Sequence, residues 1–108
     1  MKSWIILVIA GICEVVWALG LKASDGLKKP FEAAVTVVFL ALSFYLLGLA
    51  ARKIPISIAY TVWVGIGAVG AFLGGISFFG EKVTIEQALF LIVIVICMIG
   101  LKISYLQS

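Results

Sequence analysis

The chain has 108 residues, of which 65% are hydrophobic and only 12% are charged. Soluble domains have an apolar share of about 45–50%, so this composition excludes a water-soluble globular domain and predicts a protein that lies in lipid. The net charge of +3 is spread over loops and termini, which argues against a nucleic-acid partner.

Four apolar stretches are long enough to cross a bilayer, which takes about 17–25 residues. They cover about residues 4–21, 33–51, 56–79 and 85–105. The short links between them hold most of the charged residues and both prolines. Such short links leave no room for a soluble domain. We therefore expect an all-α integral membrane protein with a single four-helix transmembrane domain over residues 1–108.

The first stretch contains Glu14, the one ionisable residue between Trp4 and Leu21. A helix places it about 15 Å from its start, near the bilayer midplane. An ionised carboxylate there costs at least about 2.5–3.5 kcal/mol. Burial disfavours the anion and a bound cation favours it, so protons and a small cation would compete for Glu14. The alternative is a protonated glutamate that only joins helices. On a helical wheel one face carries Leu7, Ala10, Gly11, Glu14, Trp17, Ala18 and Leu21.

The second stretch offers Ser43, which could serve a site or simply bond its own backbone one turn back. In the third stretch Tyr60 and Trp63 are three residues apart and share a helix face. Such aromatic residues are common at membrane interfaces, but Trp63 lies about two turns into the helix, deeper than that belt usually reaches.

Glycines in the third stretch indicate close helix contact and a hinge, with packing alone as the alternative; they are Gly65, Gly67, Gly70, Gly74 and Gly75. Gly11 in the first stretch also lets another backbone approach closely. The fourth stretch has no polar residue before Lys102, so we expect it to contact lipid or another chain.

Lysine and arginine are equally divided between the two sides of the membrane. Lys2, Arg52, Lys53 and Lys102 fall on one side, and Lys22, Lys28, Lys29 and Lys82 fall on the other. Because orientation follows the difference in these charges, we expect insertion in both orientations. Two copies, one of them inverted, would build the inverted-repeat architecture of many transporters as a dual-topology homodimer. A helix boundary misplaced at Lys22 or Lys102 would change the balance by one charge.

The residues that ligate metals are sparse. There is no histidine, and the two cysteines, Cys13 and Cys97, lie one in each of two apolar helices. We expect both to be small buried apolar residues, and we expect neither a metal site nor a cofactor. Nothing supplies a nucleophile with a base beside it, so the sequence does not predict an enzyme.

Three segments carry a resemblance that covers nearly the whole chain: EVVWALGLK (14–22), IPISIAYTVWVGIGAVGA (54–71) and IGLK (99–102). They resemble the small multidrug resistance family, and Trp17 marks the guanidinium exporter subtype. The resemblance implies an antiparallel homodimer in the inner (plasma) membrane that couples guanidinium export to proton import. Glu14 would bind substrate and protons, and Trp17, Ser43, Tyr60 and Trp63 would line the pocket.

The sequence departs from the family pattern at Ser57, Ile58, Val64 and Cys97, and the loss of a hydroxyl group at Ile58 and Val64 makes the surroundings of the pocket more apolar. Two other functions stay open. One is export of bulkier quaternary ammonium or aromatic cations, and the other is a membrane partner subunit that transports nothing.

Overall fold

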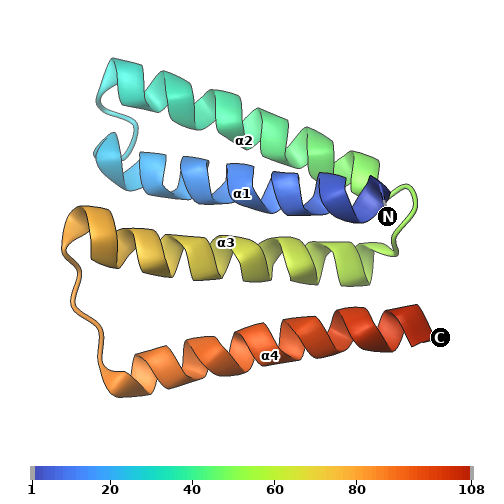
Figure 1. Ribbon diagram of the computed structural model, residues 1–108. Helices are drawn as coiled ribbons and strands as arrows, with labels where there is room; N and C mark the ends of the chain where they lie inside the picture. Colours follow the sequence, from blue (N-terminus) through green and yellow to red (C-terminus); the bar gives the residue numbers. More distant parts are fainter. Residues whose placement is uncertain (1, 108) are drawn as a thin grey trace.

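A computed structural model describes residues 2–107 as four helices joined by short links (Figure 1). Helix α1 spans Lys2–Ala23, α2 spans Pro30–Ala50, α3 spans Ile56–Phe79 and α4 spans Ile85–Gln107. All four are long and apolar enough to cross a membrane. This confirms the expected all-helical fold with four candidate membrane spans.

Proline and glycine set the ends of two helices. Pro30 begins α2, three residues before the expected start at residue 33, because its fixed φ suits the first helical position and Lys29 before it is extended. Gly80 ends α3 with a left-handed φ of 64°, and the N–H of Glu81 after it donates to the Gly75 carbonyl. A side chain at this position would be strained, so glycine fits the stop of α3.

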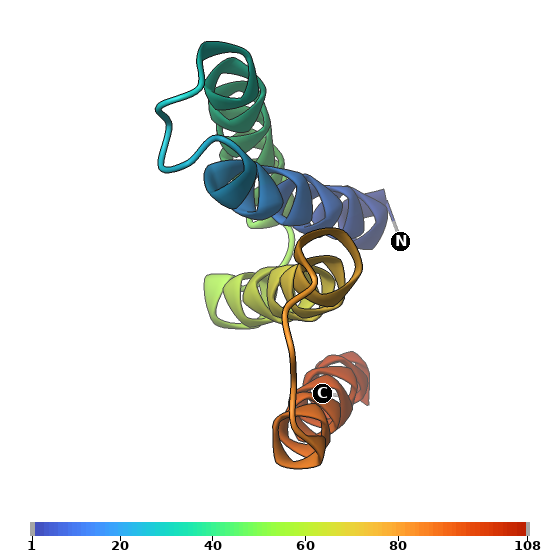
Figure 2. The ribbon, with the colours of Figure 1, turned by 90° about the vertical axis from the view of Figure 1, so that its left-hand side faces the viewer.

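Helix α1 is the centre of the bundle. It packs against α2 on one side and against α3 on the other, and the end-on view shows α3 between α1 and α4 (Figure 2). The buried apolar core comes from α1, α2, α3 and the α2–α3 link, and consists of Leu7, Ala10, Leu47, Ala50, Ile54, Ala59, Val62 and Trp63. Leu21, placed on the packed face of the first helix by the wheel, is exposed.

Glycines bring α1 and α3 into close contact. A Cβ at Gly67 would overlap the Glu14 side chain, one at Gly70 would overlap Val15, and one at Gly74 would overlap Leu19. Gly11 does the same from α1, since a Cβ there would come within 2.7 Å of Ile66. In lipid there is little hydrophobic force between helices, so this close packing supplies much of their attraction.

Helix α4 stands apart from the other three. Its backbone approaches α3 alone, and from Ile85 to Leu106 it has no buried residue. On α1, the Trp4 ring lies 6.1 Å from the Tyr105 ring and 4.8 Å from the Lys102 Nζ. The expectation that Cys97 is buried is wrong for the single chain because α4 has no second helix to cover it, whereas Cys13 on α1 is buried.

The close α1–α3 contact predicts that Gly70→Ala destabilises the protein. The new methyl group must displace Val15, and overpacking of this kind costs about 1–3 kcal/mol. We expect a lower midpoint of thermal unfolding in detergent. Gly48→Ala on α2 is the matched control, because its Cβ meets open space and alanine is the better helix former. Equal midpoints for the two variants would contradict this account of the packing.

Candidate functional site

Glu14 lies where α1 faces α3, and its side chain occupies the space that a Cβ at Gly67 would fill. Its Oε1 atom is buried and has no hydrogen-bond partner among the described residues. Buried polar atoms without a partner are rare in native proteins and call for an explanation such as a functional role. The glycine therefore makes room for a carboxylate whose bonding capacity the chain itself does not use.

Trp17, one turn further along α1, has a matching feature. Its indole Nε1 is also buried and without a hydrogen-bond partner among residues 2–107. Residues three apart on a helix are neighbours on its surface. One turn of α1 thus presents an acceptor at Glu14 and a donor at Trp17, and leaving such groups unpaired costs about 1–3 kcal/mol each.

Ser43 joins three helices through its hydroxyl group. From α2 it donates a hydrogen bond of 2.7 Å to the Ala10 carbonyl of α1, and it accepts one of 2.9 Å from the Trp63 Nε1 of α3. Both side chains are buried. In an α-helix the carbonyl of residue 10 also accepts the N–H of residue 14. Ser43 therefore anchors the turn of α1 that carries Glu14, rather than bonding its own helix.

Aromatic rings form a row across the same three helices. The Trp63 ring lies 5.5 Å from Tyr60 and 5.5 Å from Phe44, and Phe44 lies 6.5 Å from Trp17. Tyr60 and Phe44 are about half exposed, at 51% and 52%. We call these four residues the aromatic row. It presents π faces that attract cations, because the face of an aromatic ring carries negative potential.

The structure thus brings together four of the five residues that sequence analysis placed at the site, because Ser43 bonds Trp63 and the aromatic row links Trp17, Trp63 and Tyr60. Glu14 lies one turn from Trp17 on the same helix. Phe44 is the residue that sequence reasoning missed. It stands in the apolar run LALSFYLL, where nothing distinguishes it from a phenylalanine that faces lipid.

Glu14 has no salt-bridge partner within the described part of the chain. The ion pair among the described residues joins Lys22 to Glu81, at the end of the bundle that carries the α1–α2 and α3–α4 links. Among the same residues no three metal-ligating side chains gather. A carboxylate without a lysine or arginine partner keeps its affinity for a cation that comes from outside.

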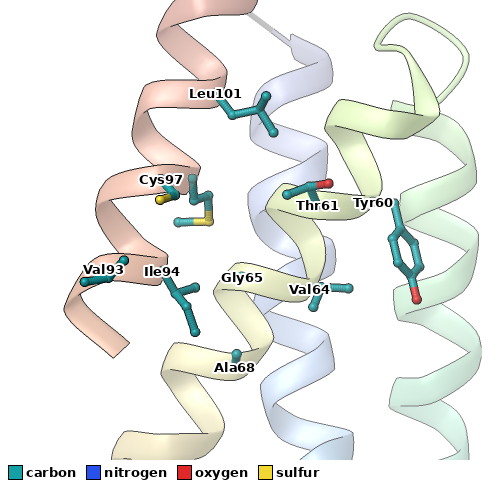
Figure 3. A pocket seen from close by; sticks show the side chains of 10 residues that line it. Tyr60, Thr61, Val64, Gly65, Ala68, Val93, Ile94, Cys97 and Leu101 are labelled. Carbon is teal, nitrogen blue, oxygen red and sulfur yellow. The ribbon is translucent and has the colours of Figure 1, made fainter. Parts of the chain in front are cut away.

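A groove of about 560 Å³ runs between α3 and α4, and Tyr60 is the one member of the aromatic row among its lining residues (Figure 3). Figure 3 shows Tyr60 turned away from the α4 side chains Cys97 and Ile94. Apart from Tyr60 and Thr61 the lining is apolar, and the Thr61 hydroxyl donates to the Ser57 carbonyl one turn back. The groove includes neither Glu14 nor Trp17, so it is not the candidate site.

The four departures from the family pattern lie on α3 and α4. Val64 and Cys97 line the α3–α4 groove, and Ile58 packs against the apolar core. The Ser57 side chain is exposed near the start of α3. At Ile58 and Val64, where the family pattern has a hydroxyl group, the side chains thus lie on packing surfaces of α3.

Comparison with known proteins places these features in a family. The family described as "Small Multidrug Resistance protein" matches residues 2–105. A protein named "Guanidinium exporter" from Escherichia coli (strain K12) is 47% identical over 102 residues, which are 94% of this chain and 97% of the relative. Relatives of the same name from Yersinia pestis and Salmonella typhimurium are each 45% identical, over 94% of this chain and 98% and 97% of their own lengths.

Four helices have the length and composition of membrane spans, and they lie within the matched region or extend just beyond it. The family match and the fold therefore both indicate a multi-pass protein of the inner membrane. With a family match over nearly its whole length and relatives close to half identical, the chain belongs to the small multidrug resistance family.

Proposed function

We propose that this protein exports guanidinium and small substituted guanidinium cations in exchange for protons, with Glu14 as the shared binding group. The observation that carries the proposal is the buried Glu14 Oε1 without a protein partner, next to the aromatic row. The name of the relatives, guanidinium exporter, supports this substrate for the present chain.

Guanidinium suits these residues chemically. It is planar, and its forked N–H donors pair with the two oxygens of a carboxylate such as Glu14. The faces of Trp17, Trp63 and Tyr60 would hold the flat cation by cation–π attraction. The hydrogen bonds of Ser43 fix Trp63 against α1, so that at least one of these rings is held in a defined orientation.

Coupling to protons follows from the use of one carboxylate for two ligands. A protonated Glu14 has no charge with which to hold guanidinium, and a guanidinium-bound Glu14 has no free oxygen pair for a proton. Binding of either ligand therefore displaces the other. An exchange of this kind moves protons inward for every cation that leaves, provided that the site opens to one side of the membrane at a time.

We propose that the working unit is a homodimer of one upright and one inverted copy. The even division of lysine and arginine between the two ends of the chain supports insertion in both orientations. The lack of burial along α4 leaves a long apolar face for contact with a second copy. Two Glu14 carboxylates in one site would titrate as a coupled pair.

A second candidate substrate class has its own support. Phe44 and Tyr60 are half exposed, so the aromatic row could also stack on bulkier aromatic or quaternary ammonium cations. A non-transporting partner subunit is the third candidate, and it would have no use for a carboxylate in the middle of α1.

Glu14→Gln keeps the shape of the side chain and removes its charge and its proton. We expect loss of guanidinium binding to the purified protein and loss of guanidinium-driven proton movement in reconstituted vesicles. Glu86→Gln is the matched control, because this exposed carboxylate lies in the first turn of α4, and we expect it to transport normally. Full transport by Glu14→Gln would exclude the proposed mechanism and favour a partner subunit.

Substrate class and pH test the competition at Glu14. We expect guanidinium to drive proton movement, whereas a large polyaromatic cation drives little. Where Glu14 is largely protonated, each unit of fall in pH should raise the apparent Kd for guanidinium about tenfold per competing proton. Binding isotherms at several pH values check this. A Kd that does not change with pH, or equal transport of the polyaromatic cation, would contradict the proposal.

Ser43→Ala removes the hydroxyl group that joins the three helices. It leaves the buried Trp63 Nε1 without an acceptor, which costs about 1–3 kcal/mol. We expect weaker guanidinium binding and a lower unfolding temperature. Trp63→Phe removes the orphaned donor, so the double variant should lose less stability than the sum of the two single variants. Additive losses would show that the Ser43–Trp63 bond is not what couples α2 to α3.

A further inference from the structure

The charges of this chain are sorted between its two ends. The end that carries the α1–α2 and α3–α4 links has four lysines and four carboxylates, the latter being Asp25, Glu32, Glu81 and Glu86. The opposite end carries the N-terminus, the α2–α3 link and the C-terminal part of α4 (Figure 1). Its basic residues are Lys2, Arg52, Lys53 and Lys102, and no aspartate or glutamate accompanies them. The excess positive charge is therefore confined to one end.

Three of these basic side chains converge on one pocket. It has a volume of about 490 Å³ and is lined by Lys2, Ser3, Ile6, Leu49, Arg52 and Lys53. The first three belong to the start of α1, Leu49 belongs to the end of α2, and Arg52 and Lys53 belong to the link that follows. We call it the basic pocket. Its lining combines cations, a hydroxyl group and two apolar side chains.

The backbone adds to the positive potential there. Helix α1 begins at Lys2, so the free N–H groups of its first turn lie beside the basic pocket. The carbonyls at the end of α2 are partly used, because the N–H groups of Arg52 and Lys53 donate to Leu49 and Ala50. The ion pair of the described residues involves Lys22 at the other end, so none of the three cations in the pocket has a carboxylate partner.

We propose that the basic pocket binds the phosphate group of an anionic phospholipid. It lies at the end of the membrane spans, at the depth where lipid headgroups lie. Arginine and lysine bind phosphate oxygens, arginine through its forked donors. Ile6 and Leu49 would contact the upper part of an acyl chain, which a free phosphate ion lacks. Basic pockets between membrane helices are known to suit anionic headgroups.

Positive charges at helix ends also set orientation, but that role does not require them to share a pocket without acidic neighbours. The opposite end makes the contrast clear. Lys28 and Lys29 are likewise adjacent and exposed in a link, yet Asp25 and Glu32 lie close to them in the sequence. This pair offers a matched control with the same change in net charge.

The test is lipid binding by the purified full-length protein in neutral detergent, measured by native mass spectrometry during titration with phosphatidylglycerol or phosphatidylcholine. Each basic residue near a membrane surface contributes about a fivefold gain in affinity for anionic lipid. We expect Arg52→Gln with Lys53→Gln to weaken phosphatidylglycerol binding about 25-fold and to leave phosphatidylcholine unchanged. Lys28→Gln with Lys29→Gln should change either lipid less than about threefold.

Three results would overturn the proposal. Equal losses of phosphatidylglycerol affinity in the two double variants would assign lipid binding to net charge alone. A wild-type protein that binds phosphatidylglycerol no better than phosphatidylcholine would exclude a specific site for anionic lipid. Displacement of phosphatidylglycerol by millimolar inorganic phosphate would assign the pocket to free phosphate. Guanidinium binding is measured on each variant as a separate test of the Glu14 site. Failure of the proposed transport function can therefore be told apart from failure of the proposed lipid site.

Discussion

The contact between Glu14 and Gly67 is the constraint on which the rest of the molecule depends. A carboxylate in the middle of an apolar helix must be shielded from lipid, and here α3 shields it by giving up a side chain. Glycines at 70 and 74 continue the same close approach along the helix pair. The path of α3 is thus fixed relative to α1 by the absence of Cβ atoms, and the carboxylate lies at the seam between the two helices.

The remaining parts of the site are positioned by this contact between α1 and α3. Ser43 brings α2 into register with both helices, because its hydroxyl group bonds a carbonyl of α1 and the indole of α3. Phe44, its neighbour in sequence, then lies between Trp17 and Trp63 and completes the aromatic row. One residue pair on α2 therefore places a polar link inside the bundle and an aromatic ring at its surface.

Sequence alone predicted the four helices, because long apolar runs and the charged links between them are signals that depend on composition. It also singled out Glu14 as a candidate site residue, since a lone carboxylate in an apolar run is conspicuous, and it suggested Trp63 from its depth. The partners of Ser43 could not be predicted, because they lie on two other helices and a single serine has a local alternative. Phe44 carries no signal of its own, and the exposure of Cys97 depends on how far α4 stands from α1 and α2.

The separation of α4 has a consequence for how this chain can change over time. The residues of a packed helix are tied to the volume of their neighbours, whereas those of α4 meet the surrounding medium along almost their whole length. One bulky aliphatic residue can replace another there without disturbing the carboxylate, the serine bridge or the rings. The first three helices thus hold the proposed site under tight steric control, while the fourth, within the single chain, is free to adapt to whatever bilayer or neighbouring chain surrounds it.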